Sequence, residues 1–164
     1  MDLRIVPLEK KYNKLKFTCG YELLDNYIKR LAKQDVNRDL SACFVLVDDN
    51  DIVKGYYTLS ANSIKREEFL DDLVKKLPPS YAELPTILLG RLAIDKSIQG
   101  MGYGEMILLD ALNRSLVISE SLGSIAVVVD PIDDFAKKIY SQYGFILLPT
   151  SGKMFLPMKT IKEM

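Results

Sequence analysis

The chain has 164 residues, of which 48% are hydrophobic, and its 22 basic side chains balance 22 acidic ones. That length and apolar content fit one compact domain, which we expect to span residues 1–164, and leave no room for a second full domain. The zero net charge excludes a global field that would draw the protein to nucleic acid or to an acidic membrane.

The N-terminal part of the chain alternates between strand-like and helical patterns. Residues 3–8 predict a short strand, and residues 21–36 predict an amphipathic helix. Residues 42–47 and 52–61 are apolar runs on either side of a polar turn, so they predict an antiparallel hairpin. The predicted helix should bury the apolar residues that recur at helical spacing, which are Leu23, Leu24, Tyr27, Ile28 and Leu31.

The middle of the chain predicts a helix, a loop and a strand. Residues 64–77 have helical spacing of apolar side chains, and the helix should end there because Pro78 cannot continue it. We expect Pro78, Pro79 and Pro85 to belong to one ordered loop. Residues 86–95 are apolar on both faces, which is typical of a central strand.

The C-terminal part supplies the remaining helices and strands. Residues 105–118 predict a long helix, and residues 124–129 predict a buried strand. Asp133 should begin a helix over residues 133–142, because a carboxylate suits the positive end of the helix dipole. The order of elements predicts an α/β domain, a mixed sheet with helices on its faces. The long helix should turn inward Met106, Leu109, Leu112 and Leu116, and two closing strands are expected at 144–148 and 153–157.

The stretch QGMGYG, residues 99–104, lies between a buried strand and the long helix. The first N–H groups of a helix have no intrahelical partner, so phosphate binds readily at such a junction, and glycines let it approach the backbone. The stretch lacks the Lys-Ser/Thr ending of a P-loop and the spacing of a dinucleotide fold. From glycine spacing alone, a strand-to-helix turn without a ligand is an equally good interpretation.

Further residues favour a cofactor site. The pattern Gln99-x-x-Gly102-x-Gly104 resembles the acetyl-CoA pyrophosphate loop of the GNAT N-acetyltransferases. Downstream, Asp133, Ala136 and Tyr140 share one helix face and precede a Tyr-Gly-Phe turn at 143–145, as in that family. The resemblance implies a GNAT fold, with a mostly antiparallel twisted sheet, and acetyl-CoA as cosubstrate without a metal. The cofactor-binding residues it implies are Leu92, Ala93, Ile94, Gln99, Gly100, Met101, Gly102, Tyr103, Gly104, Asp133 and Ala136.

The resemblance extends over residues 17–149 and is closest to the GNAT toxins of bacterial toxin-antitoxin pairs. It rests on FTCG at 17–20, LDNY at 24–27, CFVL at 43–46, GYYTLS at 55–60 and LLGRLAID at 88–95. It implies acetylation of the α-amine of aminoacyl-tRNA, which blocks translation, and a ribbon-helix-helix antitoxin as partner. Many members of the family also form a homodimer.

The resemblance assigns Tyr140 as the general acid that protonates the departing thiolate. Without the surrounding motif, Tyr140 would be an ordinary core tyrosine. No general base stands out, although Glu83 and Asp95 are candidates, and Arg91 would contact either an RNA phosphate or an acidic neighbour. A basic region that could hold a tRNA backbone, or could simply be a solvated face, contains Lys10, Lys11, Lys14, Lys16, Arg30, Lys33 and Arg38.

Two other functions remain open at this point. The balanced charge would suit a GNAT enzyme whose acceptor is a small-molecule or protein amine. A protein that binds CoA or a partner without turnover is an alternative of another class.

The cysteines and the apolar runs suggest a cellular compartment. Cys19 and Cys43 lie far apart, and no histidine completes a zinc set with them, so we expect reduced, structural thiols and no metal site. No apolar run approaches the roughly 20 residues that span a membrane, and the N-terminal segment lacks the apolar stretch of a signal peptide. We therefore expect a cytoplasmic protein.

Overall fold

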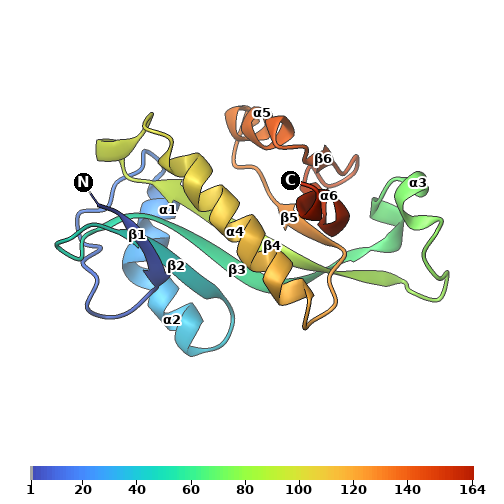
Figure 1. Cartoon of the computed structure of the whole chain (residues 1–164), viewed down its shortest axis with the longest axis horizontal. Helices are drawn as coiled ribbons and strands as arrows, with labels where there is room; N and C mark the ends of the chain where they lie inside the picture. Colours follow the sequence, from blue (N-terminus) through green and yellow to red (C-terminus); the bar gives the residue numbers. More distant parts are fainter. Residues whose placement is uncertain (1) are drawn as a thin grey trace. The chain divides into compact units, whose positions relative to one another are not determined.

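The computed structural model describes residues 2–164, which form one mixed seven-stranded sheet in the order β1-β2-β3-β4-β5-β7-β6, flanked by helices (Figure 1). The strands are β1 (Arg4–Pro7), β2 (Ala42–Val47), β3 (Val53–Lys65), β4 (Glu83–Ile94), β5 (Ala126–Val129), β6 (Ile146–Leu147) and β7 (Met154–Pro157). The α-helices are α1 (Glu22–Asn26), α2 (Ala32–Asn37), α3 (Asp71–Val74), α4 (Tyr103–Ser119), α5 (Asp134–Gln142) and α6 (Met158–Lys162). The predicted α/β class with a mostly antiparallel sheet is confirmed, since only the β4–β5 pair is parallel among the strand pairs described.

The chain divides into two compact units. The first contains the residues up to Ser60 together with Gly90–Ala111, and the second contains Ala61–Leu89 and Leu112–Met164. Each unit has its own hydrophobic core.

The first unit is built on the antiparallel strands β1, β2 and the first part of β3, as the hairpin prediction requires. The helix predicted at 21–36 is confirmed, but it contains a π-helical turn over Tyr27–Leu31 between α1 and α2. Tyr27 and Ile28 are buried as predicted, whereas Leu23 is 79% exposed and Leu31 is 43% exposed. The wider π turn changes the angular position of the residues that follow it, so a uniform 3.6-residue spacing gave the wrong face for Leu31.

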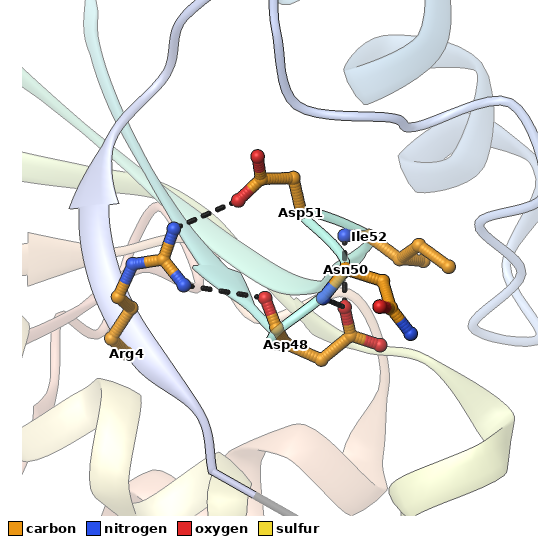
Figure 2. A network of polar contacts seen from close by, with 5 residues as sticks. All are labelled: Arg4, Asp48, Asn50, Asp51 and Ile52. Carbon is orange, nitrogen blue, oxygen red and sulfur yellow. Dashed lines mark hydrogen bonds and ion pairs between the residues drawn. The ribbon is translucent and has the colours of Figure 1, made fainter.

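The hairpin turn between β2 and β3 is tied to β1 by a polar network (Figure 2). The Arg4 guanidinium forms an ion pair with the Asp51 carboxylate at 2.8 Å and donates a hydrogen bond to the Asp48 carbonyl oxygen. The Asp48 carboxylate in turn accepts hydrogen bonds from the N–H groups of Asn50 and Ile52. The acidic run that predicted the turn is therefore held by its own main chain and by one arginine.

The second unit places β5 between β4 and β7, and all four residues of β5 are buried. Its core packs the Phe69 ring edge-on against Phe155, with centroids 5.2 Å apart. The predicted strand at 124–129 and the two closing strands are confirmed, although the paired part of β6 is only two residues long. Helix α6 after β7 was not predicted.

The helix predicted over residues 64–77 is largely wrong. The chain continues β3 to Lys65, makes one 3₁₀ turn over Arg66–Glu68, and is α-helical only over Asp71–Val74. The Arg66 guanidinium donates hydrogen bonds to carbonyl oxygens at four positions, Val74, Leu77, Pro78 and Tyr81. Arg66 therefore satisfies carbonyls of a segment that has only one short helix of its own.

Two further expectations about the middle of the chain are corrected. Pro85 does not belong to a loop with Pro78 and Pro79, because β4 begins earlier than predicted, at Glu83. Helix α4 buries Ile107, Leu108, Ala111, Leu112 and Ser115, whereas Met106 and Leu109 are more than a third exposed. The helix is apolar on much of its circumference, so the apolar pattern alone did not single out the buried face.

Candidate active site

The glycine stretch forms the loop between a 3₁₀ turn (Lys96–Ile98) and the 17-residue helix α4. Gly100 and Gly102 have φ angles of +79° and +88°, in the left-handed region that side chains other than glycine rarely adopt. A Cβ atom at either position would meet nothing within 4 Å, so the space above the loop is open. The first N–H groups of α4 border this space, at the positive end of the helix dipole.

Position 104 carries a glycine that the fold itself does not need. It lies in the first turn of α4 with an ordinary φ, and a Cβ there would contact only Ile94 Cγ1, at 3.9 Å. Neither strain nor crowding within the protein therefore requires glycine at this position. A glycine at a helix N-terminus lets an anionic group approach the backbone closely, so Gly104 fits a phosphate-binding loop.

The Gln99 side chain bonds to the protein itself. Its amide nitrogen donates hydrogen bonds to the carbonyl oxygens of Cys19, at 2.9 Å, and Ile94, at 2.8 Å. The Gln99 backbone N–H donates to the Lys96 carbonyl. Gln99 therefore braces the loop against its neighbours and does not offer these donors to a phosphate.

The three residues expected to bind the pantetheine arm end strand β4. Ala93 and Ile94 are buried and Leu92 is half-buried, so their side chains belong to the packing and only their main chain could face a ligand. Strand β3 approaches them closely, because a Cβ at Gly55 would lie 3.1 Å from the Ala93 carbonyl oxygen and 2.8 Å from Ile94 Cδ1. Gly55 is thus needed for the close approach of the two strands.

The two candidate bases occupy different environments. Asp95 is buried and accepts hydrogen bonds from the Thr18 N–H and from the N–H and hydroxyl of Ser97. Burial alone would raise the pKa of Asp95, but these hydrogen bonds outweigh it and hold the pKa below its usual range. Asp95 is therefore an anchor for the turn before the loop and a poor proton acceptor. Glu83 is exposed at the start of β4, where it accepts a hydrogen bond from Ser63.

Arg91 stacks on the ring of Tyr27, and the RNA contact expected for it stays a prediction. Its guanidinium carbon lies 3.5 Å from the centroid of the Tyr27 ring, in a cation–π stack. The Tyr27 hydroxyl donates to the Asp35 carboxylate at 2.7 Å, and burial is the main reason why the pKa of Tyr27 rises to about 12. Arg91 is half-buried in this stack, whereas Arg38 is exposed at the end of α2.

The second unit carries the predicted catalytic helix, α5. Asp133 begins it as predicted, since its carboxylate accepts the Ala136 N–H at 2.8 Å and caps the helix. Tyr140 is half-buried, with its ring 5.2 Å from that of Phe145. Burial raises the pKa of Tyr140 to about 12, so its hydroxyl stays protonated at neutral pH.

Each unit therefore gathers part of the predicted set. The first unit joins residues 92–94 to the loop at 99–104, because the Gln99 side chain bonds the last residue of β4. The second unit places Asp133, Ala136 and Tyr140 on α5. No local pattern predicted the contribution of the segment at 17–20, because its partners are remote in sequence: Cys19 and Gln99 are 80 positions apart.

Cys19 and Cys43 are free and buried, as expected, and burial raises their pKa values to about 11 and about 12. Within residues 2–164, no group of acidic or thiol side chains is placed to hold a metal ion. No helix in the same range has both the length and the apolar character needed to cross a membrane.

Comparisons with known proteins give close relatives but no matching family model. Over 134 residues the chain is 32% identical to a tRNA-acetylating toxin of Mycobacterium tuberculosis, which covers 82% of this chain and 78% of that protein. A crystal structure of a KacT mutant superimposes with a TM-score of 0.93 at 32% identity and covers 99% of both chains. AtaT in complex with acetyl-methionyl-tRNAfMet has a TM-score of 0.91 at 29% identity, over 99% of this chain and 98% of AtaT. A mutant AtaT toxin bound to acetyl-CoA and to the C-terminus of the antitoxin AtaR has a TM-score of 0.85 at 27% identity, with 99% and 98% coverage.

Proposed function

Because the chain belongs to the family of tRNA-acetylating GNAT toxins, we propose that it transfers an acetyl group from acetyl-CoA to the α-amine of an aminoacyl-tRNA and so blocks translation. The structure that supports this most directly is the loop at 99–104, an open, glycine-rich turn at the N-terminus of α4. We propose that the whole chain, residues 1–164, acts as one catalytic domain.

The loop would hold the pyrophosphate of acetyl-CoA through its main chain. The N–H groups from Gly100 to Gly104 would donate to phosphate oxygens, and the dipole of α4 would favour their charge. The main chain of residues 92–94 would bind the pantetheine arm. Asp133 and Ala136 on α5 are further proposed cofactor-binding residues. Acetyl-CoA supplies the activated acetyl group.

Tyr140 would act as the general acid. Burial keeps its hydroxyl protonated, so it holds a proton at the phenolic oxygen for the leaving sulfur. The amine nitrogen bonds to the acetyl carbonyl carbon, the carbon–sulfur bond breaks, and the sulfur takes the proton from Tyr140. The nitrogen releases its own proton to water, and Tyr140 is reprotonated from solvent.

The chain need not supply a strong base for this acceptor. An α-amine has a pKa of roughly 8, so a substantial fraction is already neutral near pH 7.5. The low pKa of Asp95 and the exposure of Glu83 agree with deprotonation by water. This is one reason to favour an α-amine over a lysine side chain, whose pKa is about 10.4.

The partners follow from the same family. We propose that Arg91, on its Tyr27 platform, and exposed Arg38 contact the acceptor RNA, that an antitoxin binds the protein, and that it works in the cytoplasm, where aminoacyl-tRNA is found. The relative AtaT has been seen both with an acetylated methionyl-tRNA and with its antitoxin.

The test is transfer of radiolabelled acetyl from acetyl-CoA to a bulk aminoacyl-tRNA pool, beside a panel of polyamines and peptides. We expect label in the tRNA fraction, released by mild alkali as an acetyl-amino acid. Label only in a small amine or a peptide would overturn the acceptor and keep the enzyme. Binding of acetyl-CoA without transfer to any amine would overturn the enzymatic proposal.

A further inference from the structure

The segment Phe17–Gly20 lies against the end of β4 and joins it to helix α1. The Thr18 N–H donates to the Asp95 carboxylate at 2.9 Å, and the Lys96 N–H donates to the Thr18 carbonyl at 2.8 Å. The segment leaves this position through Gly20, whose φ of +101° is accessible to glycine, and α1 follows directly at Glu22.

Both polar groups of the Cys19 main chain are held by side chains from different elements. The Cys19 N–H donates to the Asp25 carboxylate of α1 at 2.8 Å. The Cys19 carbonyl accepts from the Gln99 side-chain amide at 2.9 Å, and the same nitrogen also reaches the Ile94 carbonyl at 2.8 Å. One residue is therefore fixed by α1 on one side and by the glycine-rich loop on the other.

The geometry points to Asp25 as a positioning residue for the glycine-rich loop, acting through the main chain of Cys19 and the side chain of Gln99. This inference rests on the proposed function, because it takes that loop to bind acetyl-CoA. Asp25 carries the effect through two hydrogen bonds and has no need to touch the cofactor.

The physical reason is the nature of the loop. Glycine has more accessible backbone conformations than any other residue type. The loop contains two glycines in the left-handed region, Gly100 and Gly102, with φ angles of +79° and +88°. An N–H cradle binds phosphate well only when its donors are already oriented, because ordering them on binding costs free energy. Gln99 restricts the start of the loop, and Asp25 fixes the carbonyl that Gln99 bonds.

The charge of Asp25 matches this role. A carboxylate that accepts a backbone N–H forms a stronger hydrogen bond than a neutral acceptor. An asparagine at position 25 keeps a side-chain oxygen for the Cys19 N–H, whereas an alanine removes it. Asp25→Asn therefore tests the loss of the charge with the hydrogen bond kept, and Asp25→Ala tests the loss of the hydrogen bond itself.

The experiment measures the Kd of acetyl-CoA by calorimetry, together with the KM for acetyl-CoA, kcat and Tm. We expect Asp25→Ala to raise both the Kd and the KM about fivefold to tenfold, with kcat at saturation changed less than twofold. Asp25→Asn should restore binding to within about twofold of wild type. Glu22→Ala, which removes an exposed carboxylate from the first turn of the same helix, is the matched control and should leave the Kd unchanged.

A second variant tests the same relay, the chain of contacts from Asp25 through Cys19 to Gln99, at its Gln99 end. Gln99→Met keeps the length of the side chain and removes both of its hydrogen bonds. Combined with Asp25→Ala, it should weaken binding no more than the worse single substitution, because both break the same chain of contacts. The exposed position of Gln99 makes this variant available even where Asp25→Ala lowers the Tm.

Three outcomes would overturn the inference. Asp25→Ala that binds acetyl-CoA as tightly as wild type would show that the loop does not depend on Asp25. Fully additive effects of the two substitutions would show that they act separately. A wild-type protein that does not bind acetyl-CoA would overturn the proposed function, and the relay with it.

Discussion

The two units hold their proposed functional groups by different means. In the first, polar side chains that bond to the protein's own backbone fix the main chain around the loop, as Asp95 and Gln99 do. In the second, Tyr140 is held by packing against Phe145 and by the helix that Asp133 caps. The binding function of the first unit should therefore depend on residues that never touch the cofactor, and the chemistry of the second on a single hydroxyl.

The largest expected effect tests the second unit. Tyr140→Phe keeps the ring and its packing and removes only the hydroxyl group, so we expect kcat to fall about a hundredfold to ten-thousandfold. The Tm and the Kd of acetyl-CoA should stay at their wild-type values. Tyr81→Phe, at an exposed tyrosine of the same unit, is the matched control for steady-state kinetics. Unchanged kcat in Tyr140→Phe would remove the general acid from the mechanism.

The next effect tests whether the first unit depends on its anchors. Asp95→Ala removes the acceptor for three hydrogen bonds, so the free energy of unfolding should fall by about 1–3 kcal/mol at pH 7 in urea titrations.

The pH dependence of the same anchor has a definite sign. Because the pKa of folded Asp95 is lowered, its contribution to stability is present above the unfolded pKa of about 3.9 and is lost as the pH falls through the folded pKa. The stability difference between wild type and Asp95→Asn should therefore narrow in urea titrations from pH 5 down to about pH 2. A gap that is constant over this range would contradict the assignment.

A smaller effect separates the conformational and ligand roles of the loop glycines. Gly104→Ala creates no clash, so the free energy of unfolding should be unchanged or raised by up to about 1 kcal/mol. We expect the added methyl group to hinder the close approach of the proposed phosphate, so the Kd of acetyl-CoA should rise on the order of tenfold. Gly102→Ala, with its left-handed φ, should instead cost about 1–2 kcal/mol of stability. A Gly104→Ala variant that bound acetyl-CoA with the wild-type Kd would contradict the proposed phosphate contact at this position.

The smallest effect concerns the acceptor. Arg38 is exposed, so Arg38→Ala should raise the KM for aminoacyl-tRNA less than about threefold and lower the salt slope of binding by roughly one unit. Acetyl-CoA binding should not change. A salt slope equal to that of wild type would remove Arg38 from the RNA contact.

Elements with one dominant pattern could be predicted from the sequence, and those with competing patterns could not. The hairpin has two apolar runs around a polar turn and helix α5 has a capping aspartate, and each of these patterns points to one structure. Residues 64–77 fit helical spacing, but long-range contacts decided their structure, since β3 extends to Lys65 and Arg66 satisfies the carbonyls beyond it. In α4, apolar residues on several faces left the buried face undetermined until the packing was known.

The candidate site follows the same rule. Its glycines and the spacing on α5 are local, so the sequence predicts them. The brace made by Gln99 depends on a carbonyl 80 residues away, and the Arg91–Tyr27 stack joins β4 to a tyrosine far from it in sequence. Contacts of this kind have no signature in a short stretch of sequence.

The two buried thiols have a practical consequence. With pKa values of about 11 and about 12, fewer than about one in a thousand of the Cys19 and Cys43 side chains is a thiolate at pH 7.5, and only the thiolate reacts readily with maleimides or peroxide. These two thiols should therefore resist oxidation by peroxide. A fluorophore attached to a cysteine introduced on an exposed surface should label that position alone, so single-molecule experiments can keep both native cysteines.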